Sequence, residues 1–199
     1  HICIEKFLNW INGIYFKRLR AGDIYTHVFT ELKRRDPIVD LTTRKLKPFL
    51  FDAQKKGIVF DVGFGGGSFD FRQAIPALKA GFYPNSISTD LHTGSMNAAM
   101  KDMPNLMSIF LAMGMELPKV IAASTWNPAQ EINHKELGNL SIGAIADITV
   151  LNLRNGDFGF WDRMGYKING KHRFECEMTI KDGHIMYDLN GIANPVVLQ

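Results

Sequence analysis

Apolar positions in the first two thirds of the chain alternate between short runs and longer stretches with helical spacing. The runs at residues 24–29 and 58–62 are typical of short buried strands, and a third strand is expected over residues 87–90. The spacing elsewhere predicts helices over residues 41–56, 69–80, 103–113 and 118–124. Because strands that alternate with helices build parallel sheets, this pattern predicts an α/β fold, either a parallel sheet or a barrel.

The pattern changes near residue 133. Residues 146–151 and 174–180 alternate between apolar and polar side chains, as strands with one buried face do. The dipeptide Asp182-Gly183 is a strong hairpin-turn signal, and residues 185–187 resume a strand after it. We therefore divide the chain into an α/β part at 1–133 and an antiparallel part at 134–199, which we expect to be one sheet of a small β-sandwich.

Composition excludes several classes of protein. The chain has 199 residues, 46% of them hydrophobic, and a net charge of +3, which suits a globular protein of one to one and a half domains. No apolar run reaches about 18 residues, so no membrane span is expected. The basic triplet at residues 33–35 is better explained as a solvated helix face than as a nucleic-acid site.

Cysteine usage and the first residue bear on location. Cys3 and Cys176 are far apart and make no disulfide framework, so we expect a cytoplasmic protein. The chain begins with His1 and has no signal-peptide layout after it, so we expect a piece of something longer.

Four candidates for chemistry stand at expected strand ends. They are His1, His27, Asp90 and the glycine-rich segment 63–67. Each alone has an ordinary structural explanation: a histidine with a hydrogen bond, an aspartate that caps a helix, and a flexible turn. The glycines could also bind a phosphate, but they match neither of the usual phosphate-loop motifs.

The combination favours a metal site. Two histidines and an aspartate that end successive βα units would meet at one edge of the sheet. Imidazoles and a carboxylate suit zinc, which lowers the pKa of a bound water to about 7. A neighbouring carboxylate such as Asp90 can then act as general base.

Five segments carry a resemblance: GDIYTH at 22–27, FDVG at 60–63, SISTDLH at 86–92, TWNPA at 125–129 and LGNLSIGAIADITV at 137–150. They resemble the amidohydrolase superfamily, and in particular its dihydroorotase-like amidohydrolase/deacetylase branch. Their order and spacing fit the family over nearly the whole chain.

The resemblance implies a fold and a site. The fold would be the C-terminal half of a (β/α)8 TIM-like barrel, strands five to eight, plus part of a small β-sandwich. The site would hold one or two zinc ions in the family. His1, His27 and Asp90 match the metal ligands of the fifth, sixth and eighth strands, with Asp90 also the general base. His92 would lie near the bound substrate.

The sequence also departs from the family. It contains no His-x-His pair and no bridging lysine, so at most three metal ligands remain. Phe64 stands where close relatives have a histidine, and with Gly65 it would lie on the substrate side.

One hypothesis leads, a second is its alternative, and a third is the least favoured. The first is a zinc-dependent hydrolase of amide, cyclic amide or ester bonds in a small-molecule substrate. The second is a truncated, inactive fragment that serves as a structural or dimerising module. The third is a phosphate-binding protein that uses residues 65–67. We expect no nucleic-acid partner and leave assembly into a homo-oligomer open.

Overall fold

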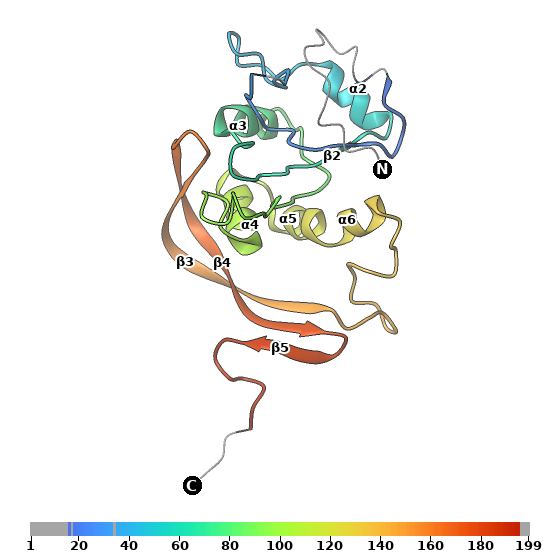
Figure 1. The fold of residues 1–199 in the computed structure, drawn as a ribbon, viewed down its shortest axis with the longest axis vertical. Helices are drawn as coiled ribbons and strands as arrows, with labels where there is room; N and C mark the ends of the chain where they lie inside the picture. Colours follow the sequence, from blue (N-terminus) through green and yellow to red (C-terminus); the bar gives the residue numbers. More distant parts are fainter. Residues whose placement is uncertain (1–15, 17, 34, 196–199) are drawn as a thin grey trace.

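The computed structural model of the chain describes residues 16, 18–33 and 35–195. They form a mixed α/β fold, in which the helices of residues 103–131 lie between a short parallel sheet and a long antiparallel hairpin (Figure 1). The elements are β1 (Ile24–Tyr25), α2 (Phe49–Lys55), β2 (Val59–Phe60), α3 (Phe71–Lys79), α4 (Met103–Ala112), α5 (Leu117–Ser124), α6 (Trp126–Glu131), β3 (Ile148–Trp161), β4 (Lys167–Lys181) and β5 (His184–Asp188). Among the described residues, no helix is long and apolar enough to cross a membrane.

The three predicted strands of the α/β part lie side by side and run in parallel. β1 pairs with β2 through Ile24 and Val59, and a parallel bridge joins Asp61 to Ser86. The third segment continues along β2, since the amide of Phe64 donates to the Ser88 carbonyl at 3.1 Å. The order and direction of the predicted strands are thus confirmed, although the third makes only an isolated bridge. All three segments therefore end at one edge of the sheet.

Most predicted helices are confirmed, with one correction. α3, α4 and α5 each lie within a residue or two of the expected bounds. The helix expected over 41–56 is wrong in its first half, because helix begins only at Phe49. The Asp40 carboxylate accepts the amides of Thr42 and Thr43 and so forms a turn, which a bridge between Val39 and Leu46 closes. A polar side chain that binds the backbone locally competes with helix formation.

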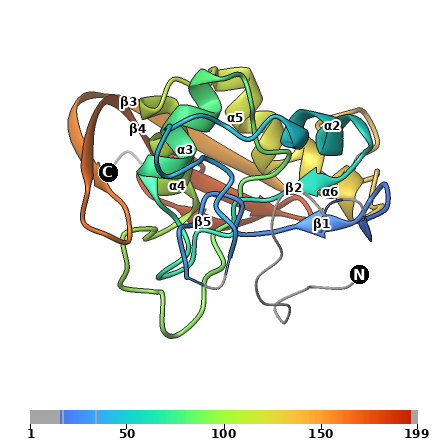
Figure 2. The same cartoon turned by 90° about the horizontal axis from the view of Figure 1, so that it is seen from above.

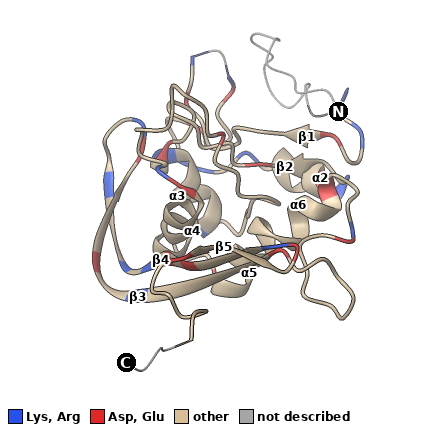
Figure 3. Cartoon of the chain, turned by 60° about the horizontal axis from the view of Figure 1, so that its bottom comes forward, with Lys and Arg blue, Asp and Glu red and all other residues tan. Residues whose placement is uncertain are grey.

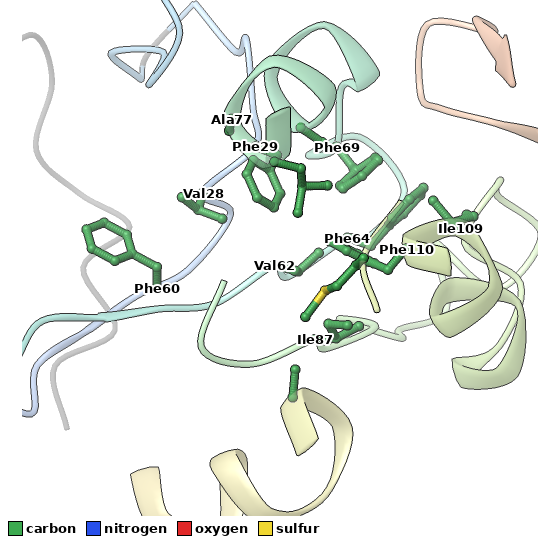
Figure 4. Packing of buried hydrophobic residues seen from close by; sticks show 14 of the residues in the cluster. Val28, Phe29, Phe60, Val62, Phe64, Phe69, Ala77, Ile87, Ile109 and Phe110 are labelled. Carbon is green, nitrogen blue, oxygen red and sulfur yellow. The ribbon is translucent and has the colours of Figure 1, made fainter. Parts of the chain in front are cut away.

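Aromatic side chains fill the core between the sheet and the helices. Phe29, Phe64, Phe69 and Phe110 are buried from three different parts of the chain and converge (Figure 4). Phe64 stacks on Phe69 with ring centroids 4.3 Å apart and an interplanar angle of 16°. Such contacts contribute about 0.5–1.5 kcal/mol each beyond the area that they bury.

The antiparallel prediction is confirmed, with longer strands than expected. β3 pairs with β4 and β4 with β5, and the turn at Asp182-Gly183 has the positive φ values, 49° and 76°, of a tight hairpin turn. The described residues contain this one three-stranded sheet, so the second sheet of a sandwich stays a prediction. Phe160 and Phe174 of the hairpin join the same core as the helices, and the division at residue 134 stays a prediction.

The tip of the hairpin is fastened to α3. The Asp162 carboxylate accepts the amide of Phe71 at 2.9 Å and so caps that helix from a distant part of the sequence. Arg163 pairs with the buried Asp70 at 2.9 Å, and burial raises the pKa of that carboxyl against the effect of the pair.

Figure 2 shows the tip of the hairpin and the β1–β2 pair on opposite sides of the molecule. Figure 3 shows acidic and basic residues interspersed over the described ribbon.

Candidate active site

His27 follows β1 and adopts the left-handed conformation, with φ of 58°. Its Nδ1 lies 2.6 Å from the carbonyl oxygen of Gly63. A carbonyl only accepts hydrogen bonds, so Nδ1 carries a proton, and in the neutral ring Nε2 then keeps a lone pair. The half-buried ring is thus held in the tautomer in which Nε2 can bind a metal.

Asp90 ends the third parallel segment and is also left-handed, with φ of 49°. Its side chain is exposed and lies beside Gly65, where an added Cβ would be 2.7 Å from Oδ2. An added Cβ at Gly63 would likewise lie 2.7 Å from Nδ1 of His27. Left-handed residues other than glycine are uncommon and cluster at functional sites. Both candidate ligands therefore pack on the same short segment, 63–65.

A tight loop follows Asp90 and is built around the buried Ser95. The hydroxyl of Ser95 accepts the amide of His92 at 2.9 Å and lies 3.1 Å from the Asp90 carbonyl. His92 itself is exposed, and its Nδ1 accepts the amide of Gly94 at 3.1 Å. This loop fixes the main chain at Asp90 and leaves the carboxylate at the surface.

Asp61 lies beneath the strand ends and is almost completely buried. Its carboxylate accepts hydroxyl hydrogen bonds from Thr26 at 2.6 Å, Ser88 at 2.7 Å and Ser86 at 2.9 Å. Three hydroxyls from the two neighbouring segments therefore converge on one carboxylate of the central strand segment. Burial raises the pKa of the nearby Glu131 on α6, and the charge of Asp61 raises it further. The sequence pattern predicted no such cluster, although an aspartate inside an apolar run is a signal for one.

The remaining predicted site residues have different surroundings. Phe64 is 1% exposed and its ring lies in the core, while the backbone of Gly65 donates to the Thr89 carbonyl at 2.9 Å. Substrate contacts of Phe64, Gly65 and His92 stay predictions. His1 lies outside the described residues. The amide of Gly65 is used within the fold, which weakens the case for a phosphate loop.

His27 and Asp90 offer donor atoms of the kinds that zinc binds, but two ligands are fewer than zinc takes from protein. An imidazole Nε2 and a carboxylate are suitable ligands, and a zinc ion takes at least three from protein. Within the described part of the chain, no cluster of three or more His, Cys, Asp or Glu side chains could hold a metal. His27 and Asp90 are thus a partial set.

Comparison with known proteins gives a consistent result. Residues 50–186 match the family described as the amidohydrolase family. A deacetylase of Enterococcus faecalis is 33% identical over 171 residues, which are 85% of this chain and 46% of that protein. A deacetylase of Brucella anthropi is 36% identical over 152 residues, or 74% of this chain and 36% of that protein. The chain therefore spans less than half the length of these curated relatives.

Solved structures extend the comparison to the fold. The crystal structure of an adenine deaminase superposes with a TM-score of 0.82 at 32% identity, over 87% of this chain and 47% of that one. The crystal structure of a dihydroorotase superposes with a TM-score of 0.74 at 33% identity, over 85% and 46% of the two chains.

Proposed function

Because the chain belongs to the amidohydrolase family, we propose that it supplies part of the active site of a metal-dependent hydrolase. The bond cleaved would be an amide, a cyclic amide or an ester. One observation carries the proposal: His27 and Asp90 end parallel segments, both are left-handed, and both pack on residues 63–65. The names of the relatives, which include deacetylase and dihydroorotase, support a reaction at a carbon–nitrogen bond.

The proposed fold is the C-terminal half of a (β/α)8 barrel, with the hairpin as part of a β-sandwich. Three parallel segments in sequential order, with helices between and after them, support it. So does the match to about half of each related structure.

Zinc is the proposed metal, held by Nε2 of His27 and the carboxylate of Asp90. When bound, zinc supplies Lewis acidity for the carbonyl and lowers the pKa of water. Further ligands would come from outside the described residues, His1 among them. The hydrogen bond from His27 Nδ1 to Gly63 keeps Nε2 free for this role.

Asp90 is the proposed general base. Its exposed carboxylate can take the proton of the attacking water and return it to the leaving nitrogen or oxygen. His92 lies two residues on and is also exposed, and we assign it to the substrate side with Gly65, whereas the ring of Phe64 lies in the core. The substrate would be a small molecule, and a cytoplasmic location remains our expectation.

An inactive structural or dimerising module is the second candidate. The observation that favours it is the partial ligand set of the described residues. The two candidates differ in what they predict for metal content and turnover.

Hydrolysis of N-acetyl and O-acetyl substrates by the protein as its gene encodes it, with its zinc content measured, tests the proposal. Asp90→Asn should lower kcat by at least about 100-fold, since general base catalysis contributes that much. Asp157→Asn is the matched control, because that carboxylate lies on the hairpin and its side chain is 87% exposed. Full activity of Asp90→Asn, or wild-type protein without zinc or turnover, would overturn the assignment.

A further inference from the structure

We propose that Asp61 is a positioning residue that fixes the tautomer and orientation of His27. This inference rests on the proposed function, in which His27 is a metal ligand. Asp61 is 9% exposed and lies one residue after β2, so it does not reach the surface where substrate would bind. Its effect on the site must therefore pass through other residues.

The first connection runs through Thr26. The Thr26 hydroxyl donates to Oδ2 of Asp61 at 2.6 Å, and Thr26 directly precedes His27 in the chain. His27 is held in the left-handed region, which costs about 1 kcal/mol or more and persists only where neighbouring contacts enforce it. The Thr26–Asp61 hydrogen bond is one such contact.

The second connection runs through Ser88 and Gly63. The Ser88 hydroxyl donates to the same Oδ2 of Asp61 at 2.7 Å and accepts the amide of Gly63 at 3.0 Å. The carbonyl of Gly63 then accepts the proton of His27 Nδ1 at 2.6 Å. The Ser88 hydroxyl has one hydrogen, which it gives to Asp61, so its oxygen is free to accept the Gly63 amide and to hold that peptide in place. Asp61 thereby holds both the residue before His27 and the residue to which the imidazole donates.

A third hydroxyl provides a control within the same cluster. Ser86 donates to the other oxygen of Asp61, Oδ1, at 2.9 Å, and the same hydroxyl lowers the pKa of Glu131 on α6 against the effect of burial. This branch leads away from His27 toward a helix. Removing it costs one hydrogen bond to Asp61 but interrupts neither connection to the imidazole.

Loss of either connection should change the metal affinity of His27 and the ring nitrogen that carries its proton. A general loss of folding stability would not move the proton. Groups that orient a metal-bound histidine typically change metal affinity by about 10–100-fold when removed. They also decide which ring nitrogen carries the proton.

The test is ¹⁵N NMR of the imidazole of His27 in the metal-free chain, at a pH where the ring is neutral, followed by titration with zinc. Thr26→Val, Ser88→Ala and Asp61→Asn should each shift the His27 proton from Nδ1 toward Nε2 and weaken zinc binding by about 10–100-fold. Ser86→Ala should leave the wild-type tautomer and affinity. Thr26→Ser keeps the hydroxyl and should restore both.

Two results would overturn the inference: an unchanged tautomer in Thr26→Val and Ser88→Ala, or an equal shift in Ser86→Ala. If Asp61→Asn does not fold, the two hydroxyl variants carry the test, since each leaves the carboxylate in place. The tautomer is read without metal or turnover. A shifted tautomer in a protein that never hydrolyses a substrate would therefore refute the proposed function and leave the role of Asp61 intact.

Discussion

The strand ends at His27 and Asp90 reach similar backbone conformations and hold their side chains in opposite ways. At His27 the ring is half-buried, and its Nδ1 is bound to the Gly63 carbonyl. At Asp90 the main chain is held by Ser95, while the carboxylate is exposed and has no hydrogen-bond partner among the described residues. The first arrangement suits the proposed metal ligand, which would bind in one orientation. The second suits the proposed general base, which would receive and release a proton.

The largest effect on this comparison is expected from Gly63→Ala. The new Cβ would lie 2.7 Å from Nδ1 of His27 and even closer to the Thr26 hydroxyl, at φ of 48°. Overpacking and the left-handed conformation together should cost about 3 kcal/mol of folding free energy, measured by urea denaturation. Gly67→Ala is the control, because its Cβ would meet nothing within 4 Å. Equal stability of the two variants would show that the His27 end is not tightly packed.

Gly65→Ala should have a smaller effect on stability. Its Cβ would lie 2.7 Å from Oδ2 of Asp90, which is an exposed side-chain end that can turn away. The left-handed φ of 55° should cost about 1–2 kcal/mol. Turnover per folded molecule should also fall, since the displaced group is the proposed base. A loss as large as that of Gly63→Ala would mean that Asp90 is held as rigidly as His27.

Ser95→Ala separates the two strand ends. Removing the buried hydroxyl leaves the His92 amide without its acceptor, at a cost of about 1–2 kcal/mol in thermal or chemical denaturation. Turnover should fall because the main chain at Asp90 is released. The His27 tautomer should be unchanged, and a shift there would show that the two ends are coupled.

The smallest effect concerns the pH dependence of stability through Glu131. Burial raises the pKa of Glu131, so the folded state favours its protonated form. The stabilisation by the protonated form is fully present below the ordinary pKa of glutamate, and it is lost as pH rises through the raised pKa. Glu131→Gln should therefore be at least as stable as wild type near pH 7, and the difference should shrink in acid.

Glu136→Gln is the control of opposite sign. The hydrogen bond with His134 lowers the pKa of Glu136, so its contribution is present above the ordinary pKa and is lost as pH falls. Thermal melts of both variants from pH 4 to pH 7 make the comparison. If the difference in melting temperature from wild type changes with pH in the same direction in both variants, the account of Glu131, in which its charged form destabilises the fold, is contradicted.

The sequence predicted the parts of the fold that depend on local patterns. Apolar runs gave the parallel segments, helical spacing gave α3 to α5, and Asp182-Gly183 gave the hairpin turn. The helix over 41–56 failed because Asp40 binds the backbone of the next turn, which hydrophobic spacing does not report. The hairpin strands were predicted too short, since bulges after Val150 and Asn155 interrupt the alternation.

The candidate site was predictable only in part, for a physical reason. His27 and Asp90 stand at the ends of strands that the hydrophobic pattern predicts, so the sequence alone made them candidates. The role of Asp61 depends on hydroxyls 25 to 35 residues away in sequence, which meet only when the strands pair. An aspartate inside an apolar run marks Asp61 as unusual, but its hydroxyl partners cannot be read from the neighbouring sequence.

The central claim is that His27 and Asp90 form one metal site, and a double-mutant cycle of zinc affinity tests it most directly. The three variants are His27→Ala, Asp90→Asn and the two combined, with binding measured by calorimetry. If both side chains hold the same ion, each single change weakens binding about tenfold or more, and the double change costs less than the sum of the two. Strictly additive losses, or a single change without effect, would show that the two strand ends do not share a metal.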